Sequence, residues 1–411
     1  MRVTHIVRRL LQLPVFTAVA VITLAIGIGA NSAIFSVIEG VLLKPLPYPN
    51  PDELVVLDHN AAGIGLNHTG AAPFLYFTYR EDSRVFGDVA MWQTDTESVT
   101  GLAEPEEVQS IIVPERVLPM LGATPMVGRL FTKDDDSPSA EATAILTAGY
   151  WRSRFGGDPS AVGRRIMVNG RPREIVGVLS DSFRFLDRKP SLILPMRLDR
   201  SKVFLGQFNY TGVARLKPGA TLEQATADVA RLIPISLTRF PPFQGYSVKM
   251  FEEARLEPNL RLLKAEVVGD VGSVLWVLMG TIGLVLLIAC ANVANLLLVR
   301  AEGRQQELAV RAALGASRGR IAYELLAESV ILGLVGGVAG LAVAFGAIRL
   351  LVALAPGNLP RLDNITIDAT VLIFTLAISI VAGLLFGAIT GSRCARRSAA
   401  RGSCRWRCRT T

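Results

Sequence analysis

The chain has 411 residues, of which 50% are hydrophobic, and its net charge is +8 at pH 7. A mean hydropathy of +0.40 is high for a soluble globular protein. The apolar residues gather in four stretches with basic residues beside them, which favours membrane helices and excludes a nucleic-acid-binding domain as the reason for the charge.

Four apolar stretches are each long enough to cross a bilayer as a helix, since a span needs roughly 20 mostly apolar residues. The first lies at 14–38, and after a long mixed sequence three more follow closely at 272–299, 329–355 and 371–390. We therefore expect four transmembrane helices in a one-plus-three arrangement. The first stretch is longer than the apolar core of a signal peptide and no clear cleavage site follows it, which favours a retained anchor.

The distribution of arginines predicts which side of the membrane each segment occupies. Arginines are concentrated in the N-terminal residues 1–13, in the segment 300–328 and in the tail 391–411. The positive-inside rule places these three segments, and hence both termini, in the cytoplasm. Residues 39–271 and the short loop 356–370 are then extracytoplasmic. The prediction is a multi-pass protein of the bacterial inner membrane with one large outer domain.

The outer domain reads as mixed α and β structure. Its entry contains Pro45, Pro47, Pro49 and Pro51, so the first helix should stop near Leu43 and continue as an extended connector. Short strand-like runs recur through the domain, at Leu54–Leu57, Val108–Val113, Ala144–Leu146, Arg165–Val168 and Glu174–Leu179. Their alternation with helical segments predicts an α+β fold of two small lobes rather than one large sheet.

Two local signals in this domain are specific. Asn169-Gly170 between two strand-like runs predicts a tight hairpin, because both turn residues can adopt positive φ. Thr221 followed by Gln224 has the spacing of a helix-capping box. The next residues, Leu222, Ala225, Val229 and Leu232/Ile233, form one apolar helix face.

The spans carry few polar groups, so an ion or proton relay through them is not expected. Asn31 and Ser32 lie in the first span, and Asn292 and Asn295 share one face of the second. We expect the asparagines to form hydrogen bonds between helices, with a substrate path as the alternative. GxxxG pairs permit close helix packing, within the chain or with a second copy; they are Gly333/Gly337, Gly336/Gly340 and Gly383/Gly387.

The sequence contains no signature of catalysis. No phosphate-binding loop is present, so any ATP hydrolysis belongs to another chain. His59 and His68 lack metal-ligand spacing and are expected to be a loop pair, and Asp134-Asp135-Asp136 is expected to be a solvated acidic turn. The four cysteines form neither a disulfide framework nor a metal site. The prediction is a non-enzymatic chain with no cofactor or metal of its own.

Four segments resemble one family: residues 16–55, residues 113–136 with their Leu-Gly-x-x-Pro and Gly-Arg motifs, residues 150–185, and residues 292–329. Together they resemble the permease subunits of MacB/FtsX-type ABC transporters, and among these the duplicated orphan permeases of acidobacteria, over nearly residues 1–390. In this chain the module occurs once.

The resemblance implies a mechanotransmission mechanism. Such permeases act as homodimers, or as paired modules, on separate ATPase subunits, and ATP-driven movement passes through a cytoplasmic coupling segment to the outer domain. The substrate class would be an amphiphile such as an antimicrobial peptide, a macrolide-like drug or a lipid-linked molecule. By match to the family motif, coupling falls on Glu307, Arg311, Ala313, Gly315 and Ala316. An ordinary topology-setting loop is the alternative for this segment.

The tail departs from the family pattern after Gly387. Its Arg, Cys and Ser bias is typical of a shifted reading frame or a truncation. Two other hypotheses therefore stay open: a non-energised membrane-anchored scaffold or sensor, and an inactive fragment of a double-length orphan permease.

Overall fold

The computed structural model describes six segments of the chain, which are residues 14–101, 104–186, 188–269, 271–303, 318–354 and 365–407. The chain divides into two compact units. One comprises Met1–Lys44 and Asp270–Thr411 and is helical, and the other comprises Pro45–Gly269 and is the inserted α+β domain.

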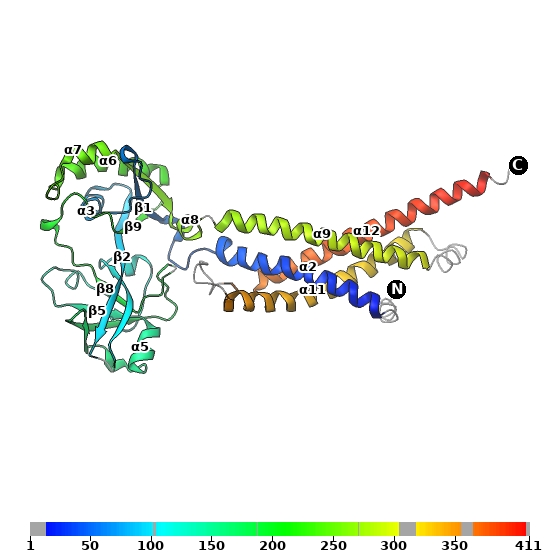
Figure 1. The fold of residues 1–411 in the computed structure, drawn as a ribbon, viewed down its shortest axis with the longest axis horizontal. Coiled ribbons are helices and arrows are strands. Elements are labelled where there is room, and N and C mark those ends of the chain that lie inside the picture. Colours follow the sequence, from blue (N-terminus) through cyan, green and yellow to red (C-terminus); the bar gives the residue numbers. More distant parts are fainter. Residues whose placement is uncertain are drawn as a thin grey trace. The chain divides into compact units, whose positions relative to one another are not determined.

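Four long helices build the helical unit (Figure 1). They are α2 (Pro14–Ile38), α9 (Val271–Gly303), α11 (Arg318–Leu354) and α12 (Ala369–Arg407). Each contains a stretch long and apolar enough to cross a membrane, at Pro14–Leu43, Val271–Arg300, Leu326–Leu354 and Ala369–Ile389. The expected membrane fold, with four such helices in a one-plus-three arrangement and an α+β domain between the first two, is confirmed.

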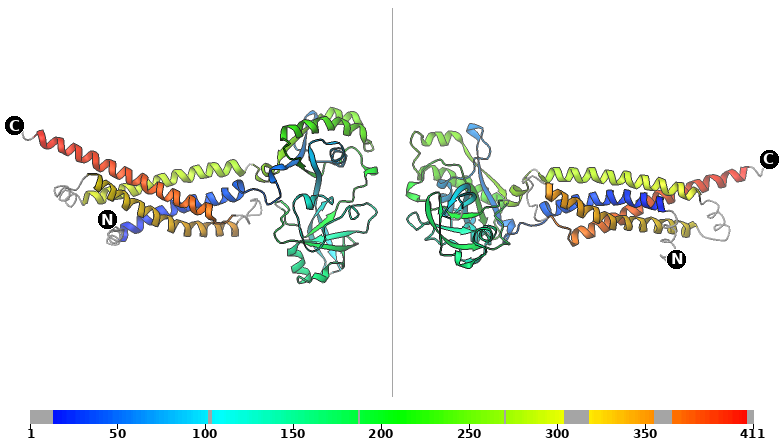
Figure 2. Two further views of the ribbon diagram at one scale, coloured as in Figure 1. Left: turned by 180° about the vertical axis from the view of Figure 1, so that it is seen from behind. Right: turned by 60° about the horizontal axis from the view of Figure 1, so that its bottom comes forward.

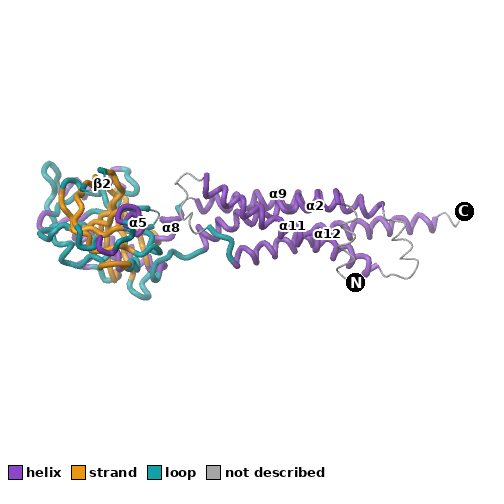
Figure 3. Tube along the Cα trace, turned by 90° about the horizontal axis from the view of Figure 1, so that it is seen from below, coloured by secondary structure: helices purple, strands orange, loops and turns teal. Residues whose placement is uncertain are grey.

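The helices form a four-helix bundle in which α2 is the most buried member. One hydrophobic cluster joins Leu24 of α2 to Val293 of α9 and Phe386 of α12. A second cluster near the other end joins Val41 to Leu275 and Ile348. Extended contacts connect α2 with α9 and α11, and α12 with the same two helices. Helices α9 and α11 therefore lie diagonally across the bundle from each other. Figure 3 shows the bundle from below.

The first helix ends where the proline-rich connector predicts. α2 passes into a π-helical turn, η1 (Glu39–Leu43), and Lys44 has the extended ψ of 133°. At the other end of the bundle, α12 does not end at the predicted limit of the fourth span. Its helical backbone continues to Arg407 (Figure 2).

Within the described residues of the inserted domain, ten strands form one sheet. They are β1 (Leu54–Ala61), β2 (Phe86–Thr100), β3 (Glu106–Val113), β4 (Pro125–Gly128), β5 (Thr143–Leu146), β6 (Arg165–Val168), β7 (Arg171–Leu179), β8 (Leu192–Pro195), β9 (Thr211–Leu216) and β10 (Leu256–Leu262). The order is β10-β1-β9-β2-β3-β8-β5-β7-β4, and β6 pairs with β2 and β7. The β3/β8 and β5/β7 pairs are parallel, and the others are antiparallel.

Helices cover this sheet and connect its strands. They are α3 (Pro73–Asp82), α4 (Val117–Met120), α5 (Ala148–Phe155), α6 (Leu222–Arg239), α7 (Val248–Ala254) and α8 (Leu263–Val268), with short 3₁₀ turns at Pro51–Glu53, Ala62–Ile64, Pro159–Ala161 and Arg200–Lys202. Helices α3, α6 and α7 lie with β1 and β9, whereas α5 lies near β5 at the other end of the domain (Figure 1).

Both local signals predicted from the sequence are confirmed. Val168 pairs with Arg171 across a two-residue turn, in which Asn169 has φ 49° and Gly170 has φ 72°. Thr221 accepts a hydrogen bond from the Gln224 N–H and donates its own N–H to the Gln224 side chain, which completes the capping box of α6.

The expectation of two lobes without one large sheet needs a correction. Separate hydrophobic clusters do occupy the two ends of the domain, one around Phe74 and Val229 and one around Trp151 and Ile175. The fifteen-residue strand β2 nevertheless runs through both, since its first half pairs with β9 and its second half with β3. One strand that serves two cores makes a continuous sheet.

Candidate functional site

Polar side chains of α2 join the bundle from its interior. Asn31 donates from Nδ2 to the Gly27 carbonyl at 2.8 Å and to the Ile282 carbonyl of α9 at 3.2 Å. The hydroxyls of Ser32 and Thr375 of α12 lie 2.8 Å apart. These contacts are buried, and in an apolar environment each leaves its polar groups satisfied. α2 is thus bonded directly to two of its neighbours.

Glycines bring α11 close to α12. A Cβ atom at Gly333 would lie 2.5 Å from the Ser379 carbonyl oxygen, and one at Gly337 would lie 2.2 Å from the Ser379 hydroxyl. On α12, a Cβ at Gly383 would lie 2.9 Å from the Val330 Cα, and one at Gly387 would lie 3.0 Å from Ser329. These four glycines therefore occupy the α11/α12 contact, where the helices approach too closely for a side chain, whereas Gly336 and Gly340 face α2.

The predicted packing asparagines lie elsewhere. Asn292 and Asn295 are exposed on α9 within the described unit. Asn31 of α2 does donate a hydrogen bond between helices, to the Ile282 carbonyl of α9. These two amides are therefore exposed polar groups on a strongly apolar helix.

The predicted coupling residues Glu307, Arg311, Ala313, Gly315 and Ala316 lie outside the described residues. The helices on either side of them are described. α9 is continuous over 33 residues, about 50 Å at the rise of an α-helix, and it ends at Gly303, while α11 begins at Arg318.

An ion pair connects these two flanking helices. Arg300 Nη1 of α9 lies 2.8 Å from Glu328 Oε1 of α11, and each side chain is 8% exposed. The Arg300 guanidinium carbon also lies 5.1 Å from the ring centroid of Phe16 of α2. Three helices therefore meet at the bundle end next to residues 304–317. The sequence analysis missed this pair because it placed Glu328 in the cytoplasmic segment.

The opposite end of the bundle has its own charged contact. Lys44 Nζ lies 3.1 Å from Glu39 Oε2 and 3.0 Å from Asp368 Oδ2. Glu39 belongs to the π-helical turn and is 6% exposed, and Asp368 caps α12 through the N–H groups of Thr370 and Val371. Partial burial works against the charge of Lys44, but the Asp368 and Glu39 carboxylates raise its pKa overall.

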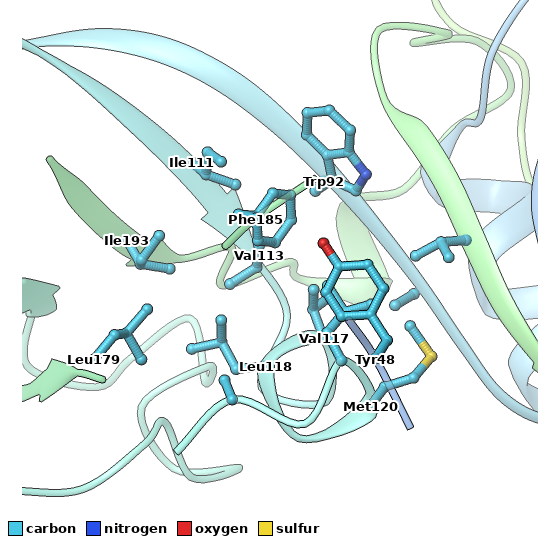
Figure 4. Packing of buried hydrophobic residues seen from close by; sticks show 14 of the residues in the cluster. Tyr48, Trp92, Ile111, Val113, Val117, Leu118, Met120, Leu179, Phe185 and Ile193 are labelled. Atoms are coloured by element: carbon cyan, nitrogen blue, oxygen red, sulfur yellow. The ribbon is translucent and has the colours of Figure 1, made fainter. Parts of the chain in front are cut away.

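Within the inserted domain, the incoming and outgoing chain enter one hydrophobic cluster (Figure 4). Leu46 and Tyr48 come from the entry, Leu263 and Val267 come from the exit helix α8, and they share the cluster with Trp92 of β2. The Tyr48 hydroxyl donates to the Arg184 carbonyl at 2.9 Å and accepts from the Leu186 N–H at 2.7 Å. A displacement of either connection therefore reaches the same part of the domain core.

Two sequence expectations in the domain are wrong in detail. His59 is not a loop residue: it is fully buried in β1, between the Tyr79 hydroxyl at 2.8 Å and the Gly70 carbonyl at 2.8 Å. The acidic run is not simply solvated either. Asp135 is buried and paired with Arg129, and the half-buried Asp136 accepts a hydrogen bond from the Arg197 N–H at 2.7 Å.

Asp136 and Glu115 form a coupled carboxyl pair. Burial raises the pKa of Asp136 to about 7, and the Glu115 carboxylate beside it adds to the rise. Burial acts on Glu115 in the same direction, but its hydrogen bond with Asp136 and the Arg80 guanidinium hold its pKa below the usual range. The Arg80 side chain comes from α3 at 2.9 Å. The Asp136 carboxyl is therefore expected to titrate near neutral pH, because it is buried beside a second carboxylate.

Four membrane-length helices, with an α+β domain inserted in the sequence between the first and the second, define a class of multi-pass membrane protein. Residues 17–232 match the family model described as "MacB-like periplasmic core domain", and residues 279–399 match "FtsX-like permease C-terminal". The chain therefore belongs to the MacB/FtsX-like family of ABC transporter permeases, as its sequence motifs predict. It is a membrane protein with a periplasmic-type domain.

Two curated relatives illustrate this membership. The chain is 27% identical over 259 residues to the "Uncharacterized ABC transporter permease YknZ" of Bacillus subtilis, covering 62% of this chain and 61% of that one. It is 27% identical over 220 residues to the "Macrolide export ATP-binding/permease protein MacB" of Chromobacterium violaceum, covering 53% and 32%. The chain thus spans less than two thirds of these relatives.

Among solved structures, the periplasmic region of MacB from Actinobacillus actinomycetemcomitans aligns with a TM-score of 0.38 and 13% identity. The alignment covers 55% of this chain and 91% of that one.

Proposed function

We propose that this chain is the mechanotransmission permease of an ABC-type efflux or extraction system. A separate ATPase subunit binds the predicted coupling residues between Glu307 and Ala316, within the cytoplasmic segment 300–328. Its ATP-driven movement is passed along the helices to the extracytoplasmic domain. Both termini are cytoplasmic in this proposal, in agreement with the arginines that flank the spans.

The continuity of α9 is the observation that carries the proposal. It is one helix of 33 residues that starts directly after the domain and ends directly before the coupling segment. A hydrogen-bonded helix transmits an axial or tilting displacement along its whole length. The family membership supplies the kind of partner, since permeases of this family work with ABC ATPases.

The substrate is proposed to be an amphiphile that the outer domain handles without passage between the helices. The few polar side chains of α2 that point into the bundle are used in helix contacts. Relatives of this chain are named as export proteins for macrolides and for pyoverdine. These names support export of an antimicrobial peptide, a macrolide-like drug or a lipid-linked molecule.

The proposal includes a second permease copy or module. α9 is the least buried of the four helices, and its exposed surface carries Asn292. Because an amide is unfavourable in contact with lipid tails, we propose that a second α9 covers this surface.

Reconstitution tests the function directly. The chain is placed in nanodiscs with its ATPase subunit, and ATP hydrolysis is compared with that of the ATPase alone. We expect stimulation by the wild type, and a loss of most of it when the charge is reversed in Glu307→Arg or Arg311→Glu. Lys189→Glu, an exposed charge reversal in the outer domain, is the matched control and should keep full stimulation. Equal stimulation in all four proteins would refute the coupling assignment, and no stimulation by the wild type would favour the scaffold or sensor.

A further inference from the structure

We propose that Arg300 and Glu328 are positioning residues that make α9 and α11 move as one body when the coupling segment moves. This inference rests on the proposed function and adds to it the device that distributes the movement. The pair joins the last turn of the described α9 to α11, at an N–O distance of 2.8 Å. It lies outside the predicted coupling motif.

The geometry of the bundle makes this pair unusual. Among the described residues, α9 and α11 form no extended helix–helix contact, because α2 and α12 lie between them. Figure 1 shows α9 and α11 on opposite sides of α2. Two long side chains reach across this diagonal and meet beside Phe16 of α2. The contact therefore links two helices that the main packing leaves separate.

Burial gives the contact its rigidity. Arg300 closes the second span and Glu328 lies at the start of the third, and both side chains are 8% exposed. Without Arg300, the Glu328 carboxylate would stay buried, which is far less favourable than the loss of a surface pair. The stacked ring of Phe16 further fixes the guanidinium plane. The two helices cannot slide past each other at this level without breaking the pair.

The ion pair lies next to the segment that is proposed to bind the ATPase. Residues 304–317 begin one turn beyond Arg300, and Glu328 lies about 15 Å into α11 from its start at Arg318. Movement applied to that segment enters both helices, one of which continues to the outer domain. The other, α11, packs closely on α2, where a Cβ at Gly29 would lie 2.7 Å from the Gly340 carbonyl oxygen. With the pair intact, both chain connections of the domain receive the same movement.

Four proteins test the pair: the wild type, Glu328→Gln, Arg300→Gln, and the exchange Arg300→Glu with Glu328→Arg. The control is Arg349→Gln, which removes an arginine of α11 whose guanidinium carbon lies over a phenylalanine ring, 4.5 Å from the centroid of Phe345. Each protein is purified in nanodiscs, and only monodisperse material is compared. Spin labels at Val299 and Tyr323, which are 70% and 69% exposed, report the distance between α9 and α11. The native cysteines are replaced in this background.

The distance measurement needs no ATPase. We expect a narrow distribution for the wild type and the control, a broad one for each single variant, and recovery of a narrow one in the exchange. Unchanged distributions in the single variants would overturn the proposal. This result stands whether or not the chain stimulates an ATPase, so it separates a failure of the pair from a failure of the proposed function.

The coupling measurement follows in the reconstituted complex. We expect the single variants to bind the ATPase as the wild type does and to lose about tenfold in stimulation, which corresponds to about 1.4 kcal/mol of coupling. The exchange should restore most of it. If the wild type stimulates and the single variants show equal stimulation per folded complex, the pair is only structural and the proposal is wrong.

Discussion

Lys44 Nζ lies 3.0 Å from Asp368 Oδ2, so the residue that ends the first helix is paired with the residue that caps the last. Glu39, one turn earlier, completes the group at 3.1 Å from the same ammonium. The lysine and Asp368 are about one third exposed, whereas the Glu39 side chain is 8% exposed. Removal of each of the three charges by itself should therefore change the stability of the helical unit by a different amount.

We expect Lys44→Met to destabilise the helical unit by about 1–2 kcal/mol, because it leaves the Glu39 carboxylate buried without a counter-charge; the solvent exposure of Lys44 keeps this below the cost of breaking a fully buried pair. Asp368→Asn should cost less than about 1 kcal/mol, since it removes an exposed partner. The double variant Lys44→Met with Glu39→Gln should recover part of the loss. Thermal unfolding in detergent measures all three, and equal losses for both single variants would contradict this ranking.

Asp136 should make the outer domain sensitive to pH. Its pKa is raised to about 7 in the folded protein, above that of a free aspartate. Its stabilising contribution is therefore complete below the pKa of the unfolded chain and is lost as pH rises through about 7. Glu115 is ionised in both the folded and the unfolded protein above pH 5, so it adds no pH dependence to the stability there. The partial burial of Asp136 limits the effect to about 1–2 kcal/mol.

The measurement compares the stability of Asp136→Asn with that of the wild type at each pH. This comparison is needed because His59 changes the stability with pH in the opposite direction. Burial lowers the pKa of His59, so its contribution is present above the unfolded pKa and is lost as pH falls. Both proteins share this term, and it cancels in their difference. We expect Asp136→Asn to gain stability relative to the wild type from pH 5 to pH 8, measured by unfolding followed through Trp92 and Trp151. A difference that does not change with pH would show that Asp136 does not titrate in this range.

Close packing between α11 and α12 should make Gly333 intolerant of any side chain. A Cβ there would lie 2.5 Å from a backbone carbonyl oxygen that cannot move independently. We expect Gly333→Ala to cost about 1–3 kcal/mol, the usual range for overpacking. Gly346 lies in the same helix and has no atom within 4 Å of its Cβ position, so Gly346→Ala should be neutral. Similar melting temperatures for both variants would argue against a tight interface.

The proposed second copy predicts a cross-link through α9. In a background without the native cysteines, Asn292→Cys should form a disulfide-linked dimer upon mild oxidation in the membrane. Val293→Cys is the control, because Val293 is fully buried within the same helix of one chain. Cross-linking at both positions, or at neither, would indicate that the exposed asparagine surface is not where two copies meet.

Local rules predicted much of the fold. Proline positions located the end of α2, Asn169-Gly170 located a hairpin, and Thr221 located the start of a helix, since each depends on residues adjacent in sequence. Local rules could not predict that the single strand β2 runs through both ends of the domain. It depends on pairing with β9, more than one hundred residues later, and its polar middle resembles a loop between two strands.

The candidate site was harder to predict than the fold. The glycine spacing correctly suggested close helix contact but could not specify that Gly333 faces Ser379. The Arg300–Glu328 pair left one signal, which is a single acidic residue at the very edge of an apolar stretch. Its partner could be identified only once the helices were placed, because the two residues lie in different spans.

The shared cluster of Leu46, Tyr48, Leu263 and Val267 sets how the outer domain responds to force. A domain tethered by flexible linkers has slack at its attachments, and small displacements are absorbed by the linker before they reach the core. Here both attachments are embedded in a close-packed interior, which has low compressibility. A displacement applied at either attachment should therefore reach the domain core without being taken up by the connecting chain.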